Sequence, residues 1–170
     1  MPSIRFATLQ DSVALAKIYN WYIENSTITF EEELVSAGDM AQRIAVTDNT
    51  RPWFVLEVSS ADGKEHVSEI LGYAYAARWK DRSAYRFARE TSIYLAPDQS
   101  GEGYGQLLYE RLIAALRETE IHMLIAGIAL PNAASIALHE KLGFKKAGEF
   151  EEVGRKFDNY LNVGYWQLLL

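Results

Sequence analysis

Residues 91–112 read TSIYLAPDQSGEGYGQLLYERL, and this stretch decides the fold. Its first part, Thr91 to Leu95, alternates like a β-strand, and its last part carries apolar residues at helical spacing. Between them Gly101, Gly103 and Gly105 leave the backbone without side chains, directly before the unpaired N–H groups and positive dipole end of the helix. Such a loop favours a phosphate as its ligand, although a purely structural turn has the same pattern.

Two other phosphate-binding loops are excluded by spacing. A P-loop requires Gly-Lys-Ser/Thr, but Gly105 is followed by Gln106 and Leu107. A dinucleotide fingerprint requires glycine or alanine five residues after its first glycine, and Gln106 stands five residues after Gly101. The loop therefore belongs to neither class.

The remaining patterns predict an α/β fold with a mixed, mostly antiparallel sheet of six to seven strands and helices on both faces. Capping-box signals at Thr8 to Asp11 and Ser36 to Asp39 predict two helix starts. Trp53–Ser59 and Glu69–Trp79 predict an antiparallel pair around a turn at Asp62-Gly63. Further strands are expected at 3–7, 86–95, 124–130 and 160–168, and further helices after 105 and from 132 to Gly143.

Composition narrows the class of protein. A chain of 170 residues that is 49% hydrophobic predicts one domain, residues 1–170, with a sizeable core. The absence of cysteine excludes disulfides, thiolate metal sites and a cysteine acyl carrier. A net charge of -6 opposes nucleic-acid binding, because phosphate backbones require a basic surface.

The sequence also predicts that no membrane is involved. The longest apolar run, Met123 to Pro131, falls short of the roughly 18 residues that a membrane span needs. Residues 1–7 lack a basic stretch followed by an apolar one, so no secretory signal is expected there. We therefore expect a cytoplasmic protein.

One segment departs from the acidic average. Residues 78–89 contain five basic side chains against the single acid Asp81: Arg78, Lys80, Arg82, Arg86 and Arg89. This composition indicates a local positive field, or simply a solvated loop.

The helix after Pro131 carries polar residues at regular spacing. Asn132, Ser135 and His139 fall on one stripe, and Ala134, Leu138 and Leu142 form a separate apolar stripe. The helix is therefore expected to face both a ligand and the core. Spacing alone is equally consistent with Asn132 as a plain N-cap and His139 as a core-bordering residue.

Several ordered motifs resemble the GNAT superfamily of acetyltransferases, over nearly the whole chain. The glycine loop resembles its pyrophosphate loop, and residues 132–144 resemble its second motif. Other segments resemble the phosphinothricin acetyltransferase branch: Trp79-Lys80-x-Arg82-x-Ala84-Tyr85, Glu90-x-Ser92-Ile93-Tyr94, Lys156-Phe157 and Tyr165-Trp166-Gln167.

The resemblance implies a GNAT fold, a homodimer without metal, and acetyl-CoA as cosubstrate. By resemblance, the acetyl group passes in a direct attack to the α-amino group of a small anionic acceptor such as phosphinothricin, methionine sulfone or methionine sulfoximine. The residues implied to bind acetyl-CoA are Ile93, Tyr94, Leu95, Ser100, Gly101, Glu102, Gly103, Tyr104, Gly105, Gln106, Asn132 and Ser135. Those implied to bind the acceptor are Trp79, Lys80, Arg82 and Tyr85.

Two catalytic residues follow from the same resemblance. An α-amino group with a pKa of about 8 is roughly 90% protonated at pH 7, so a base is useful. Glu90 stands at the family's position for that base, and His139 stands where a group protonates the departing thiolate. Without the resemblance, Glu90 reads as a surface residue that pairs with Arg86 or Arg89.

The chain departs from the superfamily at two loop positions, where Ser100 and Glu102 replace the usual basic or amide residues. A carboxylate about 4 Å from a phosphate charge costs roughly 1 kcal/mol in water and about 4 kcal/mol in a partly shielded site. Glu102 is therefore expected to point away from the phosphate.

Two other functions remain open from the sequence. One is a module that binds acyl-CoA without turnover, against which the presence of both Glu90 and His139 argues. The other is an acetyltransferase for protein N-termini or polyamines, whose cationic acceptors would suit an acidic protein.

Overall fold

The structure is a computed structural model that describes residues 2–60 and 67–170. Its strands are β1 (Pro2–Phe6), β2 (Trp53–Ser60), β3 (Val67–Arg78), β4 (Ala88–Leu95), β5 (Met123–Ala129), β6 (Lys145–Lys156) and β7 (Asn159–Leu169). Its α-helices are α1 (Ser12–Asn25), α2 (Ala37–Ala45), α3 (Tyr104–Arg117) and α4 (Ala133–Lys141). Short 3₁₀ turns lie at Leu9–Asp11, Ser83–Tyr85 and Pro97–Gln99.

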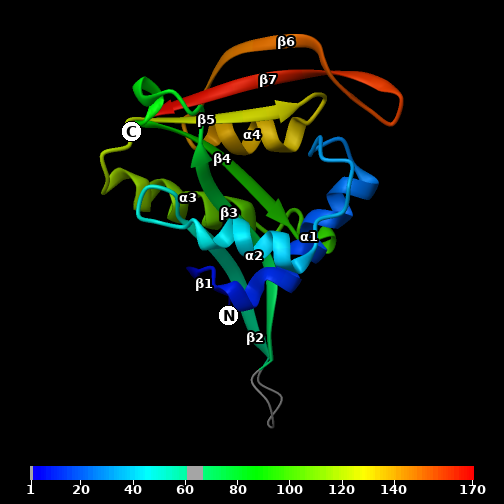
Figure 1. Cartoon of the computed structure of the whole chain (residues 1–170), viewed down its shortest axis with the longest axis vertical. Coiled ribbons are helices and arrows are strands. Elements are labelled where there is room, and N and C mark those ends of the chain that lie inside the picture. Colours follow the sequence, from blue (N-terminus) through cyan, green and yellow to red (C-terminus); the bar gives the residue numbers. More distant parts are fainter. Residues whose placement is uncertain (1, 61–66) are drawn as a thin grey trace.

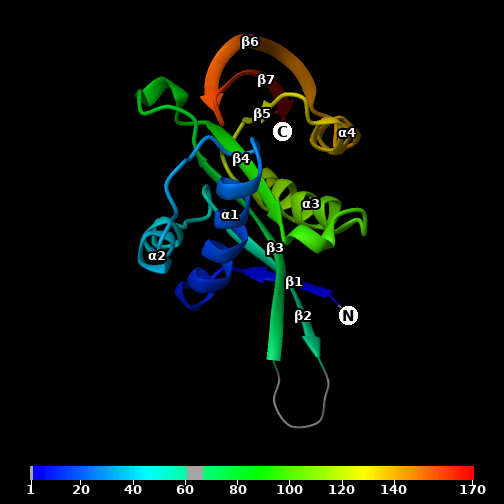
Figure 2. The ribbon, with the colours of Figure 1, turned by 90° about the vertical axis from the view of Figure 1, so that its right-hand side faces the viewer.

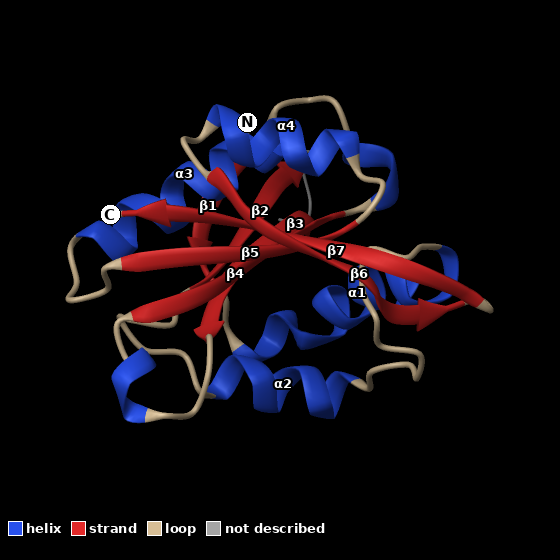
Figure 3. Cartoon of the chain, turned by 90° about the horizontal axis from the view of Figure 1, so that it is seen from above, coloured by secondary structure: helices blue, strands red, loops and turns tan. Residues whose placement is uncertain are grey.

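The described residues form one seven-stranded sheet in the order β1-β2-β3-β4-β5-β7-β6. Within it β4 and β5 run parallel, and the other neighbouring strands run antiparallel (Figure 1). The helices α1 and α2 cover one face, and α3 and α4 cover the other (Figures 2 and 3). The predicted mixed sheet with helices on both faces is therefore confirmed.

Each face of the sheet has its own core, because side chains alternate along the strands. On β2, Phe54 and Leu56 pack with the apolar residues of α3, whereas Trp53 and Val55 pack with those of α1. Each such fully buried side chain stabilises the fold by about 1.5–3 kcal/mol. The two cores fix α1 and α3 on opposite sides of β4.

The strand β6 was not predicted from the sequence. Most of its residues are exposed, and it carries Glu149, Glu151 and Glu152 in a single run. The apolar alternation that reveals a half-buried strand is therefore missing. The turn predicted at Asp62-Gly63 lies outside the described residues.

Strands β4 and β5 separate soon after they begin. They pair only from Ala88 to Glu90 on β4, opposite residues 123–125 of β5. Beyond that point β4 continues to pair with β3 as far as Leu95, and β5 with β7 as far as Ala129. The sheet thus opens between β4 and β5 at the end that points to the glycine loop.

Candidate active site

A cavity of about 390 Å³ lies between the start of α3 and the outer side of α4. Gly103, the residue before α3, takes a left-handed conformation with φ of 81° and has no side chain that caps the helix. Because Leu107 makes the first intrahelical bond, to the Gly103 carbonyl, the N–H groups of the first turn remain available to an anion. A side chain at Gly105 would meet Leu138 at 3.3 Å, so glycine also lets the two helices approach.

The predicted acetyl-CoA-binding residues line this cavity, with two exceptions. Tyr94 lines the two adjoining cavities instead. Glu102 is exposed and is not among the lining residues, as the charge argument requires. Lys141, at the end of α4, was not predicted and brings a positive charge to this cavity.

The two predicted stripes of α4 do not separate a ligand-facing side from a core-facing side as clearly as expected. Asn132 does cap the helix, since its Oδ1 accepts a hydrogen bond from the Ser135 N–H at 3.1 Å, and it also lines the cavity. Ala134 and Leu138 line the cavity too, whereas His139 is buried with only 3% exposure. The expected division between core and ligand faces holds only in part. Leu138 and Leu142 pack against the core, but Leu138 also lines the cavity, because the stripes lie only about 100° apart around the helix.

His139 sits in a hydrogen-bonded chain that fixes its tautomer. Its Nδ1 lies 2.7 Å from the Ser135 carbonyl, which can only accept, so Nδ1 carries the proton. Nε2 of the neutral ring then accepts from the Tyr109 hydroxyl at 2.9 Å, and Tyr109 accepts from the Thr91 hydroxyl at 2.7 Å. Burial lowers the pKa of His139, which favours this neutral ring.

Between the separating strands lies a small cavity of about 50 Å³. Its walls include Thr91 and Tyr94 from β4, Gly127 from β5, and His139 from α4. It adjoins the larger cavity through Ile93, Asn132 and Ser135, which line both. The opening of the sheet therefore leads from the glycine loop to the centre of the molecule.

Glu90 faces a third cavity, of about 320 Å³, on the other side of the strand opening. Ser92 and Tyr94 line it with Glu90, as the strand alternation predicted. Glu90 is half-buried, and among the described residues its carboxylate has no hydrogen bond or ion pair. Burial raises the pKa of this carboxyl above its ordinary value.

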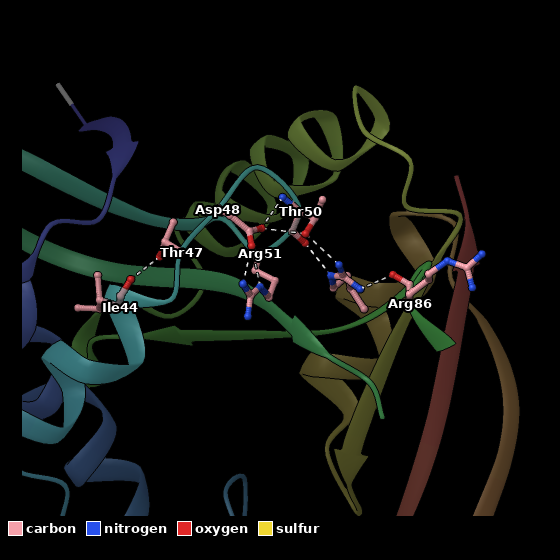
Figure 4. Close-up of polar contacts among 7 residues, drawn as sticks. Ile44, Thr47, Asp48, Thr50, Arg51 and Arg86 are labelled. Atoms are coloured by element: carbon pink, nitrogen blue, oxygen red, sulfur yellow. Dashed lines mark hydrogen bonds and ion pairs between the residues drawn. The ribbon is translucent and has the colours of Figure 1, made fainter. Parts of the chain in front are cut away.

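Neither neighbouring arginine neutralises Glu90. The Arg89 guanidinium is buried and donates to the Thr50 carbonyl at 2.7 Å, the Thr50 hydroxyl at 2.9 Å and the Arg86 carbonyl at 2.8 Å. Figure 4 shows Thr50 and Arg86 in this group, with Asp48 bonded to Thr50 and Arg51. The Arg86 side chain donates to the Ser83 carbonyl. The surface-pair interpretation of Glu90 is therefore wrong.

The basic loop forms a separate, open cavity that shares no lining residue with the Glu90 cavity. It brings together all the predicted acceptor-binding residues: Trp79, Lys80, Arg82 and Tyr85. Lys80 Nζ lies 5.4 Å from the centre of the Trp79 ring, and that ring packs edge-on against Tyr165 at 5.6 Å. Tyr165 also lines the Glu90 cavity. The contact between the Trp79 and Tyr165 rings therefore joins the basic loop to the wall of that cavity.

Comparison with known proteins agrees with this geometry. Residues 4–163 match the family described as the acetyltransferase (GNAT) domain. The chain belongs to the GNAT family of acetyltransferases. This GNAT enzyme is accordingly an N-acetyltransferase with acetyl-CoA as its cosubstrate.

Similar proteins include two curated enzymes and one solved structure. The GNAT enzyme is 34% identical over 164 residues to a phosphinothricin N-acetyltransferase of Streptomyces coelicolor, covering 96% of this chain and 94% of the relative. It is 36% identical over 169 residues to an L-methionine sulfoximine/L-methionine sulfone acetyltransferase of Pseudomonas aeruginosa, covering 99% and 94%. A phosphinothricin acetyltransferase of Sinorhizobium meliloti in complex with acetyl-CoA superposes with a TM-score of 0.89 at 33% identity, covering 99% and 88%.

Part of the site was missed by sequence reasoning. The wall of the Glu90 cavity opposite β4 consists of Ile28, Thr29, Phe30, Val153 and Val163. These residues carry no motif, and only the fold brings them together.

Within residues 2–60 and 67–170 no His, Cys, Asp and Glu side chains gather as a metal site. No helix in this part of the GNAT enzyme is long and apolar enough to cross a membrane.

Proposed function

We propose that the enzyme acetylates the α-amino group of a small anionic amino-acid-like acceptor, of which phosphinothricin, methionine sulfone and methionine sulfoximine are examples. The observation that carries this proposal is the place of Glu90. Its carboxylate is half-buried and faces a cavity that meets the strand opening, and Tyr165 of this cavity packs against Trp79 of the cation-bearing loop. The names of the relatives from Streptomyces coelicolor and Pseudomonas aeruginosa support the same class of acceptor.

In this proposal Glu90 accepts the proton of the acceptor amine, whose nitrogen then attacks the thioester directly in a ternary complex. The raised pKa of Glu90 suits a base that works near neutral pH. After the attack, the nitrogen of the tetrahedral intermediate still carries a surplus proton. His139 Nε2, which carries no proton in the resting ring, takes up this proton and delivers it to the CoA sulfur as the C–S bond breaks.

The two ends of the acceptor would meet different surroundings. The Glu90 cavity is lined by apolar side chains such as Ile28, Phe30 and Val163 and, to a similar extent, by polar ones such as Thr29, Ser92 and Tyr165. It suits a compact side chain that carries a polar group. Lys80 and Arg82 lie in the cavity of the basic loop, together with the single acid Asp81, and suit the carboxylate, which binds such cations through charge-assisted hydrogen bonds.

A thiol-release assay tests the proposal. With acetyl-CoA, we expect the enzyme to release CoA with L-methionine sulfone or phosphinothricin, and far less with spermidine or an N-terminal peptide. Lys80→Gln combined with Arg82→Gln should raise the acceptor KM about tenfold or more, since hydrogen bonds to charged groups contribute about 1.5–3 kcal/mol. Lys17→Gln, on the exposed face of α1, is the matched control. A preference for spermidine would overturn the acceptor class.

We also propose that the enzyme is a cytoplasmic homodimer. Exposed apolar side chains gather on the hairpin of β6 and β7, where Phe150, Val153 and Tyr160 are 60%, 58% and 64% exposed. Such a surface on an edge strand favours association with a second copy. Light scattering across a range of protein concentrations would reveal a monomer if this is wrong.

A further inference from the structure

Lys156, the last residue of β6, is a charged side chain with only 2% exposure. Its Nζ donates to the Thr29 carbonyl at 2.8 Å and lies 5.0 Å from the centre of the Phe157 ring. Within the described part of the chain no carboxylate lies at ion-pair distance from it, although the charge of Glu32 partly offsets the effect of burial on its pKa. Burying an ammonium group against a single carbonyl is unfavourable. Its contribution to stability therefore does not explain why a lysine occupies this position.

The carbonyl that Lys156 holds belongs to a segment that forms part of the site. Ile28, Thr29 and Phe30 follow α1 and line the acceptor side of the molecule, where Val153 of β6 faces the same cavity. Ile28 also lines the cofactor cavity, so it stands at the junction of the two. In Figure 1 the hairpin of β6 and β7 passes close above this segment.

A second contact between β6 and the segment is equally close. A Cβ placed on Gly154 would lie 2.1 Å from the Phe30 ring, so the ring packs directly against the β6 backbone. The pairing of β6 with β7 shifts between Phe150 and Gly154, and Glu152 in this stretch has a φ of 51°. This irregularity bends β6 just before Gly154 and Lys156.

On its other side the segment is fixed to α1 and α2. The Tyr19 hydroxyl lies 2.7 Å from the Thr29 hydroxyl and donates to Glu31 at 2.9 Å. Glu31 in turn accepts two hydrogen bonds from Arg43, at 2.8 and 2.9 Å. Lys156 is therefore the polar link that ties an already anchored segment to β6.

We propose that Lys156 is a positioning residue that sets acceptor specificity. By holding the Thr29 carbonyl, it keeps Ile28 and Phe30 at the distance from Val153 that admits a compact acceptor side chain and rejects a bulky one. This inference rests on the proposed function, because it concerns the acceptor of the same site.

The test compares two acceptors in Lys156→Met, which keeps an apolar stem of similar length. We expect the KM for L-methionine sulfone to rise about tenfold, since small misplacements of positioning groups have effects of that order or larger. The KM for acetyl-CoA should change less than about twofold, with kcat little affected. The ratio of kcat/KM for L-methionine sulfone to that for L-tryptophan should fall about tenfold. Lys146→Met on the same strand, where the side chain is exposed, is the matched control.

Three further measurements separate specificity from folding. The thermal midpoint of Lys156→Met should change little, because removal of a buried charge offsets the loss of the hydrogen bond to the Thr29 carbonyl. Lys156→Arg retains a donor and should stay closer to the wild-type ratio. Gly154→Ala displaces the Phe30 ring and should lower the ratio in the same direction, which keeps the test available if Lys156→Met does not fold.

The results distinguish failure of the inference from failure of the proposed function. If the wild-type enzyme acetylates neither amino acid, the proposed function is wrong and the inference falls with it. If the wild-type enzyme is active but Lys156→Met and Gly154→Ala leave the acceptor ratio unchanged, only the inference is wrong. An equal loss of kcat/KM with both acceptors, together with a lower thermal midpoint, would show that Lys156 is merely structural.

Discussion

The proposed cofactor side and the proposed acceptor side of the site are built in different ways. The cofactor cavity is lined mostly by residues between Ile93 and Lys141, that is, by the end of one strand, the glycine loop and two helices. The acceptor cavity takes residues from five separate parts of the chain, from Ile28 to Tyr165. The first is largely local in sequence, whereas the second exists only when distant segments pack together.

This difference predicts how mutations act. Anion binding at the start of α3 depends on backbone N–H groups that the helix supplies by itself, so few side chains there are critical. The acceptor wall depends on single long-range contacts such as Lys156 with Thr29, which are 127 residues apart. Variants should therefore change the kinetic constants of one side while leaving those of the other, and each prediction below tests that separation.

The largest effect is expected where the two sides meet, at Glu90. In Glu90→Gln the base is lost but the shape is kept, so kcat should fall about 10²-fold or more while both KM values stay near those of the wild type. The wild-type kcat/KM should fall as pH drops through the pKa of Glu90, which burial raises above the ordinary glutamate value.

Steady-state kinetics across pH provide the measurement for Glu90. Because the wild type needs the ionised carboxylate to deprotonate an ammonium group, the ratio of wild-type to variant rates should be largest between the pKa of Glu90 and that of the amine, about 8. The ratio should shrink at lower pH, where Glu90 becomes protonated, and at higher pH, where the amine is already neutral. Glu69→Gln, on β3 and exposed, is a matched control. Full kcat in Glu90→Gln at every pH would remove Glu90 as the base.

A smaller effect is expected at Tyr109. Its replacement tests whether the hydrogen-bonded hydroxyls of Thr91 and Tyr109 affect only the cofactor side of the site. Tyr109→Phe removes the donor to His139 Nε2. Since that hydrogen bond favours the neutral ring, its loss should raise the pKa of His139. The free energy of unfolding should fall by about 1–3 kcal/mol, because buried polar partners lose a hydrogen bond. The acceptor KM should not change.

Nitrogen NMR of the imidazole measures the His139 pKa and its tautomer directly. The wild-type spectrum should show a neutral ring with its proton on Nδ1. Tyr160→Phe, at an exposed site on β7, should leave the His139 signals unaltered. A wild-type proton on Nε2 would contradict the hydrogen-bonded chain described here.

Much of the fold could be predicted because its signals are local. The glycine loop before α3, the capping residues Thr8, Ser36 and Asn132, and the helix end at Gly143 with φ of 92° all act through their nearest neighbours. The family, the mixed sheet and acetyl-CoA as cosubstrate were predicted and are confirmed. The exposed, charged strand β6 was missed, because its position depends on pairing with β7 rather than on its own pattern.

The candidate site also has one part that local sequence signals predict and one part that they do not. The residues predicted to bind acetyl-CoA follow one another in two motifs, and all of them except Tyr94 and Glu102 line one cavity. Phe30 and Val153 could not be predicted, since nothing in their local sequence indicates that they meet. The roles of Glu90 and His139 stay predictions.

The smallest effect is expected at Glu102, on the exposed surface of the glycine loop. Glu102→Arg replaces a negative charge near the expected position of the phosphates by a positive one, so the KM for acetyl-CoA should fall. The change should be only a few fold, because an exposed charge pair contributes about 1 kcal/mol or less. It should also shrink in about 1 M salt, where the screening length falls to roughly 3 Å. Glu118→Arg places the same charge at the other end of α3, roughly 20 Å further along the helix, and should have no such effect. A KM for acetyl-CoA that is unchanged or higher in Glu102→Arg at low salt would mean that the loop does not approach the phosphates, and the cofactor side would then lose its electrostatic basis.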